Sequence, residues 1–298
     1  MHTNRHEFPE RDAPNVLIGV IAGAFLFFLA ISLQAHPGVG IVRDSRGNVF
    51  YTDLANIWRL APDGTSSIAV SNVHSHELSI DAGDNLYGEH LWYEGDATGK
   101  WRHYVWKRSP DGKVDKLIPE TEGFLNTYGF ARDKAGNVYW VDRESKGGPT
   151  IHRRSPAGAV TTVIQSRAFR DIGFMACLPD GTLYLNDQGD LVRVGTDGRR
   201  EMVAKRLSGD FFARSQRHKV QGICALDTGD VWVAVYARRE IKRISRDGRV
   251  QVVARSSKPF RPTGVLATPD GHLWILEDSM PGKARVRHVL PDGRELVY

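Results

Sequence analysis

The chain has 298 residues, of which 41% are hydrophobic and 25% charged, enough apolar content for a globular core. Its 40 Lys and Arg residues stand against 35 Asp and Glu and are spread along the chain, giving a net charge of +5. Basic stripes with interleaved aromatics are missing, so we expect no nucleic-acid partner. Two cysteines, Cys177 and Cys224, exclude a disulfide framework, and we expect two buried free thiols that point to opposite faces of neighbouring strands.

The first predicted element is an apolar run of eighteen residues, 16–33, without a charged side chain. Its length suits a membrane-spanning helix and also a long signal-peptide core. We expect a polar tail over residues 1–15 and a signal-anchor or transmembrane helix over 16–35, which tethers an exported, extracytoplasmic domain. The alternative is a signal that is cleaved after Ser32 or Ala35, which releases a secreted protein.

From residue 37 to the end, one pattern recurs six times at a spacing of about 40 to 50 residues. Each copy predicts an inner strand, a second strand that follows a Gly or Asp turn, a third strand that runs into a Gly turn, and a short fourth strand. The inner strands are predicted at 39–44, 76–81, 128–133, 173–178, 221–226 and 263–268. The second strands are predicted at 46–53, 83–90, 135–142, 180–187, 228–235 and 270–277. The third strands and their turns are predicted at 57–64, 105–112, 151–158, 191–198, 241–248 and 286–293.

Four strands per repeat, with almost no helical periodicity after residue 36, predict an all-β, six-bladed β-propeller of four-stranded blades over residues 37–298. A blade has two apolar faces, so blades must stack around an axis to bury both. Inner-strand glycines such as Gly40 and Gly264 fit that crowded axis. An open solenoid of the same repeats is the alternative architecture.

Blade two departs most from the repeat. Where four blades have an inner-strand glycine it has Glu77, which follows His74 and His76 in the string HSHEL. A carboxylate at a crowded axis is costly unless it is paired, hydrated or bound to a metal. We therefore interpret Glu77, His76 and His90 as candidate catalytic residues.

A column of polar residues ends the second strands: Asp53, His90, Asp142, Asp187, Val235 and Glu277, with Glu89 beside His90. This column is expected to ring one mouth of the central channel. Oxygen ligands suit Ca²⁺, Mg²⁺ or Mn²⁺, and the added imidazoles widen the choice to Zn²⁺. One divalent metal ion is therefore predicted, with candidate ligands Glu77, Glu89, His90, Asp142, Asp187 and Glu277. The alternative for the aspartates is that each accepts N–H bonds from its own turn.

An aromatic-rich insertion, 90–106, distinguishes blade two further. Its side chains either cover the channel mouth and stack on a flat or sugar-like ligand, or belong to a long hairpin whose aromatics simply pack on a neighbouring blade. A second excursion, 207–219, brings His218 ahead of the inner strand of blade five. The candidate ligand-binding residues are Trp92, Tyr93, Tyr128 and His218.

The repeat markers resemble NHL-type repeats and the gluconolactonase (senescence-marker-protein) group of six-bladed propellers, with some likeness to streptogramin B lyase-type repeats. The first resemblance implies a divalent metal held at the axis by Glu77 and Asn126, which polarises a lactone. At the positions where that group has an aspartate ligand, this chain has Ile172-Gly173 and Gln221-Gly222. At the position where the lyase-type repeats need a polar side chain, it has Val235. We expect a propeller that binds a small-molecule or protein ligand at its channel mouth. A metal-dependent lactone or ester hydrolase and a streptogramin-lyase-like enzyme are the alternatives.

Overall fold

The structure is a computed structural model that describes residues 37–123, 131–209, 219–279 and 282–298. The expected tail 1–15 and hydrophobic segment 16–35 lie outside these ranges, as do Asn126, Tyr128 and His218. Within the described ranges, no helix combines the length and apolar character that a membrane crossing requires. Residues from Pro37 to Tyr298 form one compact unit.

The described residues form six antiparallel four-stranded sheets, and each sheet is one continuous stretch of chain. Blade one comprises β1 (Ile41–Arg43), β2 (Val49–Thr52), β3 (Asn56–Leu60) and β4 (Ser66–Ser71). Blade two comprises β5 (Leu78–Ile80), β6 (Leu86–Tyr93), β7 (Trp101–Arg108) and β8 (Val114–Glu122). Blade three comprises β9 (Ala131–Arg132), β10 (Val138–Asp142), β11 (Thr150–Arg154) and β12 (Val160–Gln165).

The second half of the unit repeats this arrangement. Blade four comprises β13 (Ile172–Cys177), β14 (Leu183–Asp187), β15 (Asp190–Val194) and β16 (Arg200–Ala204). Blade five comprises β17 (Ile223–Ala225), β18 (Val231–Val235), the 3-10 turn η2 (Tyr236–Arg238), β19 (Glu240–Ile244) and β20 (Val250–Arg255). Blade six comprises β21 (Arg261–Ala267), β22 (Leu273–Ser279), β23 (Lys283–Val289) and β24 (Glu295–Val297). The predicted repeat of four strands is confirmed in every blade.

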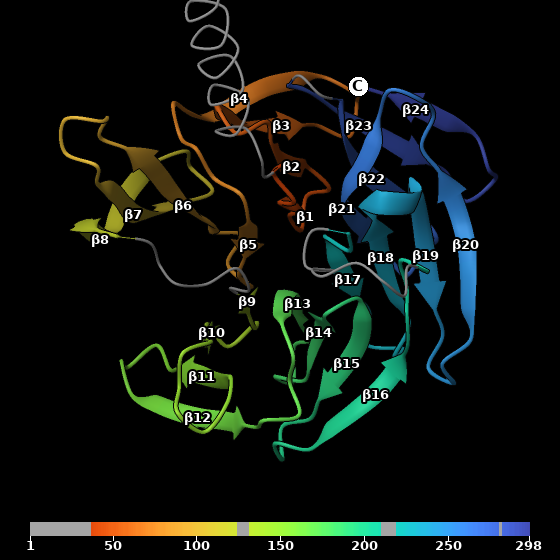
Figure 1. Cartoon of the computed structure of the whole chain (residues 1–298). Helices are drawn as coiled ribbons and strands as arrows, with labels where there is room; N and C mark the ends of the chain where they lie inside the picture. Colours follow the sequence, from red (N-terminus) through yellow and green to blue (C-terminus); the bar gives the residue numbers. More distant parts are fainter. Residues whose placement is uncertain (1–36, 124–130, 210–218, 280–281) are drawn as a thin grey trace, which may run out of the picture. The chain divides into compact units, whose positions relative to one another are not determined.

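The inner strands β1, β5, β9, β13, β17 and β21 contact one another in turn, and β21 contacts β1, so the blades close into a ring (Figure 1). The predicted closed propeller is therefore confirmed over the open solenoid. Adjacent inner strands approach very closely at Gly40, whose N–H bonds the carbonyl oxygen of His76 at 2.9 Å. A Cβ on Gly40 would lie 2.8 Å from the backbone nitrogen of Leu78, so only glycine fits there.

Hydrophobic side chains from facing blades fill the interfaces between them. Within the described ranges, such clusters join blades one and two, three and four, four and five, five and six, and six and one. Blades two and three meet instead through a cation–π contact, in which the Arg132 guanidinium lies 4.0 Å from the Tyr87 ring centre. Burial and the hydrogen bond to Asp81 raise the pKa of Tyr87 to about 12.

The two cysteines are free, as predicted. Cys177 packs on the cluster between blades three and four, whereas Cys224 packs on the cluster between blades five and six. The two thiols therefore point away from each other, which confirms the expectation from strand register. Burial raises the pKa of both thiols, that of Cys224 to about 11.

Blades six and one share no strand, and side-chain packing joins them in the part of the chain that the structure describes, together with a close approach of the Gly264 and Val39 backbones. Trp274 stacks on His288 with ring centres 4.1 Å apart, and the Arg43 guanidinium of blade one lies 5.5 Å from the Trp274 ring. His288 Nε2 is also 2.8 Å from His272 Nδ1. Burial, then the neighbouring His272 and Arg43, lower the pKa of His288 to about 4.

This junction should weaken in acid. The unfolded chain takes up a proton at His288 near pH 6.5, whereas the folded chain resists until about pH 4, so folding stability falls across that window. Because solvent partly screens the charge on His288, we expect the free energy of unfolding to fall by only about 1 kcal/mol. Urea unfolding of wild type and His288→Gln at pH 7 and pH 4.5 measures it. An equal pH dependence in both proteins would contradict the assignment.

Candidate functional site

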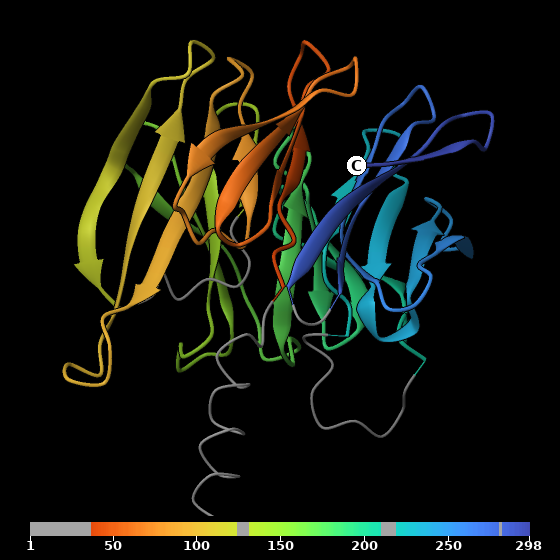
Figure 2. The same cartoon turned by 90° about the horizontal axis from the view of Figure 1, so that it is seen from above.

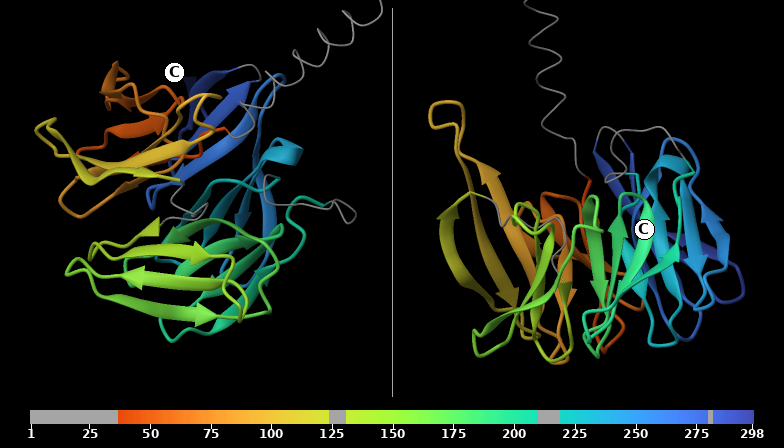
Figure 3. Two further views of the ribbon diagram at one scale, coloured as in Figure 1. Left: turned by 60° about the vertical axis from the view of Figure 1, so that its left-hand side comes forward. Right: turned by 60° about the horizontal axis from the view of Figure 1, so that its bottom comes forward.

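One end of the propeller carries the residues that the sequence singles out. It is formed by the connections that lead into each inner strand and by those between second and third strands, and we call it the entry face. Glu77 precedes β5 on this face, and the β6–β7 hairpin extends from it beyond the neighbouring blades (Figures 2 and 3). The chain also enters the described unit here, at Pro37 ahead of β1.

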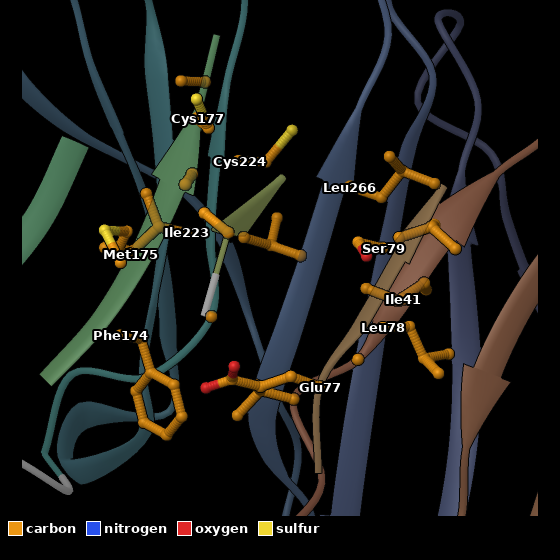
Figure 4. A pocket seen from close by; sticks show the side chains of 18 of the residues that line it. Ile41, Glu77, Leu78, Ser79, Phe174, Met175, Cys177, Ile223, Cys224 and Leu266 are labelled. Carbon is orange, nitrogen blue, oxygen red and sulfur yellow. The ribbon is translucent and has the colours of Figure 1, made fainter. Parts of the chain in front are cut away.

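Glu77 lies at the entry-face end of a central cavity of about 240 Å³. The walls come from all six inner strands, and their lining combines aliphatic side chains with the charged side chains of Glu77 and Arg132. Figure 4 shows the Glu77 carboxylate and the Phe174 ring pointing toward one another at the same end of this cavity. The predicted carboxylate at the axis is thus present, and it faces an aromatic ring that the sequence did not single out.

The three histidines of blade two gather beside this mouth. His74 Nε2 lies 3.0 Å from His76 Nε2, and the backbone N–H of His74 donates to His90 Nδ1 at 2.8 Å. Because Nδ1 accepts that bond, a neutral His90 carries its proton on Nε2. Burial lowers the pKa of His74 and of His90, so both imidazoles are predominantly neutral at pH 7.

Ser75 fixes the loop that carries these histidines. Its carbonyl oxygen accepts a 2.7 Å bond from the Thr52 hydroxyl, and its own hydroxyl donates to the carbonyl oxygen of Glu89. The indole of Trp106, which is fully buried, donates to the Ser75 hydroxyl at 3.1 Å. The loop is therefore bonded to both blade one and blade two, which positions His74 and His76 rigidly.

The aromatic insertion is a long hairpin of β6 and β7. His90, Trp92 and Tyr104 contact one another on the side of the hairpin that faces blade one. Tyr93 and Trp101 form a separate pair with ring centres 5.3 Å apart. These aromatics thus contact one another along the hairpin, and Tyr104 also packs on the cluster between blades one and two. Trp92, Tyr93, Trp101 and Tyr104 remain half-exposed, and a role for Trp92 and Tyr93 in ligand binding stays a prediction.

The acidic column is held by partners within the fold. Asp53 and Asp142 bond their own turns, Asp142 through the backbone N–H of Glu144 and the hydroxyl of Ser145. The Ser145 bond is the main reason that the pKa of Asp142 is lowered. Glu89 is half-buried on β6 opposite Val105.

Asp187 and Glu277 are fully buried and bind arginines. Asp187 accepts bonds from Arg200 at 3.1 Å and from the backbone N–H of Arg170 at 2.8 Å. Glu277 accepts bonds from Arg285 at 2.7 Å and Arg287 at 3.1 Å. These two carboxylates therefore anchor basic side chains and do not line the central cavity.

The described residues include no group of three or more His, Cys, Asp or Glu side chains placed to hold a metal ion. Glu77 is a single carboxylate in a cavity whose lining also includes the Arg132 guanidinium, and His74 and His76 direct their Nε2 atoms at each other. This donor set does not fit a divalent metal by itself. Asn126, Tyr128 and His218 lie outside the described ranges, and the metal stays a prediction.

No family model and no curated protein matches this sequence. Among solved structures, virginiamycin B lyase from Staphylococcus aureus is similar, with a TM-score of 0.52 and 15% identity over 89% of this chain and 85% of that chain. A gluconolactonase-family protein has a TM-score of 0.53 and 15% identity over 84% and 89% of the two chains. An auxiliary nutrient binding protein from Bacteroides thetaiotaomicron has a TM-score of 0.57 and 11% identity over 80% and 66%.

Identities this low establish the fold and no activity. The three neighbours include enzyme-named and binding-named proteins, so one ring of blades serves different chemistries among them. The chain is a six-bladed β-propeller of four-stranded blades whose structural neighbours include gluconolactonase-family and streptogramin B lyase-type propellers.

Proposed function

We propose that this protein is an exported, membrane-tethered propeller that binds a small ligand with a cationic group at the entry-face mouth of its central channel. The observation that carries the proposal is the Glu77 carboxylate beside the Phe174 ring at one end of the central cavity. The sequence of residues 16–35 supports the tether, which serves to hold the propeller at the membrane.

A cation suits this pair for two reasons. A carboxylate attracts positive charge strongly where apolar walls limit water, and the face of an aromatic ring attracts it through the ring quadrupole. The neutral histidines of the neighbouring loop add no positive charge, and the one guanidinium among the described lining residues, that of Arg132, is held over the Tyr87 ring. The ligand's positive centre is an organic ammonium, since the one described carboxylate does not by itself fit a divalent metal, and the cavity of about 240 Å³ leaves room for a small apolar portion.

Glu77→Gln should abolish most of this binding. Loss of one charge-assisted contact costs about 1.5–3 kcal/mol, so we expect Kd to rise roughly ten- to hundredfold. Calorimetry with phenethylammonium, and separately with Ca²⁺, Mn²⁺ and Zn²⁺ alone, on the full-length chain in mild detergent measures the effect. Phe174→Leu separates the two kinds of cation, because it weakens ammonium binding and leaves metal binding unchanged.

Glu94→Gln is the matched control, since it removes an exposed carboxylate from the same face. It should leave every affinity unchanged. Equal binding by wild type and Glu77→Gln would contradict the proposal. So would a wild-type protein that does not bind the ammonium.

A further inference from the structure

Charge on the entry face is divided between its two halves. Blades four to six form one half of this face. In their described entry-face connections and the strand ends next to them, every exposed charged side chain is basic. These side chains are Arg167, Arg170, Lys205, Arg206, Arg238, Arg255, Lys258 and Lys283. In blades two and three the exposed charges of the same face are mainly acidic: Glu94, Asp96, Glu122 and Glu144 against Lys100 and Lys146.

Buried carboxylates hold part of the basic half in place. Arg170 donates to Asp190 at 2.5 Å, while 47% of its side chain stays exposed. Arg255 pairs with Glu240, whose side chain is 11% exposed, while 66% of the arginine side chain stays exposed. The acids thus lie beneath the surface and the guanidinium groups lie upon it. An approaching partner meets positive charge first.

The chain itself indicates what lies against this surface. The apolar run 16–33 ends three residues before His36, and the described unit begins on the entry face at Pro37. If the proposed tether enters a bilayer at residue 33, only residues 34–36 separate it from the described unit, which is about 10 Å of extended chain. The face that carries Pro37 must then lie within a few residues' reach of the lipid headgroups.

We propose that the basic half of the entry face rests on an anionic lipid surface, an inference that depends on the proposed tether. Basic side chains near such a surface contribute about fivefold each to binding, and the attraction decays within a Debye length of about 8–10 Å. A linker as short as residues 34–36 allows the basic half of the face to come within that distance. The acidic half is repelled, so the propeller tilts and its blade-two hairpin and channel mouth stay open to solvent.

Lysine labelling of the full-length chain in bilayer nanodiscs tests this inference. The probes are discs of phosphatidylcholine alone and discs that also contain phosphatidylglycerol. We expect the labelling of Lys205, Lys258 and Lys283 to fall at least about threefold in the anionic discs. Lys113 lies on the opposite end, in the turn between β7 and β8, and its labelling should not change. Added salt should remove the protection.

A charge variant provides the second readout. Arg167→Gln, Lys205→Gln, Lys258→Gln and Lys283→Gln together remove four exposed cations. The matched control removes four exposed cations from the opposite end through Arg46→Gln, Lys113→Gln, Lys134→Gln and Arg199→Gln. In flotation with phosphatidylglycerol vesicles, we expect the first variant to lose roughly 600-fold in salt-sensitive binding, about fivefold for each of four cations, and the control to lose little.

The outcomes test the lipid-binding surface and the membrane tether independently. Flotation that resists a carbonate wash shows that the tether inserts, whatever the lysine labelling gives. If the carbonate wash removes the protein from the vesicles, the proposed tether is wrong. Comparison of salt-sensitive flotation between wild type and the two charge variants still tests whether the basic half binds anionic lipid. Equal lysine labelling in both kinds of disc, or equal loss in both variants, overturns the lipid surface. Protection by a DNA duplex or polyglutamate but not by lipid would assign the face to another anionic partner and likewise overturn it.

Discussion

Glu277→Gln is expected to lower the free energy of unfolding by about 3–5 kcal/mol. The carboxylate is fully buried and accepts bonds from Arg285 and Arg287, the second of which is itself 6% exposed. Removing its charge takes away the buried anion that Arg285 binds and leaves Arg287 with the partly exposed Glu295 as its remaining anion. Urea unfolding followed by tryptophan fluorescence measures the change.

Glu295→Gln is the control for this prediction. Glu295 bonds the same arginine, Arg287, at 2.7 Å, but 47% of its side chain is exposed. Solvent replaces the lost partner, so the cost should stay below about 1 kcal/mol. If the two variants unfold at the same urea concentration, burial is not what gives the Glu277 network its stabilising effect.

Trp106→Ala is expected to cost about 3–5 kcal/mol, because it empties a large site in the core between blades one and two. The ring is fully buried and lies over Gly88 on the adjacent strand, where a Cβ would collide with the indole. The change also removes the indole N–H that bonds Ser75 and leaves that buried hydroxyl with one partner fewer. We therefore expect both global destabilisation and a loosened His74–His76 loop.

Two measurements separate these effects. Urea unfolding gives the global loss, and Trp92→Ala, which removes a half-exposed ring from the same hairpin, should lose much less stability. NMR titration of the imidazoles reports the loop, and a more solvated His74 should show a pKa that moves up toward 6.5. An unchanged His74 titration in Trp106→Ala would show that the bonds to Thr52, Glu89 and His90 position the loop without the indole.

The fold could be predicted because its signals are local. Gly turns such as those at Gly64 and Gly293 mark strand ends by backbone geometry, and six copies reinforce one another. The position of Glu77 at the axis followed from the same alignment of repeats. Its facing ring, Phe174, could not be predicted in this way, because it belongs to a blade two positions further around the ring and looks ordinary in its own strand.

The acidic column shows why the electrostatics of the site were harder to predict. Asp187 reads as one more member of a ring of carboxylates, yet its partners are the backbone of Arg170 and the side chain of Arg200. Such pairing depends on which side chains the sheet brings together, and no spacing in the sequence records it. Likewise, the basic residues are spread evenly along the chain and gather on one half of a face only after folding.

Each blade consists of a single uninterrupted segment, and blades six and one meet without exchanging a strand. The boundary of the structural unit therefore coincides with the boundary of the repeat in the gene. A recombination event between two repeats adds or deletes one whole blade and never leaves a sheet with a missing strand. Rings that borrow a strand across the closure lack this property, because their first and last repeats are not interchangeable with the others. In this chain, blade number and blade content are free to evolve separately.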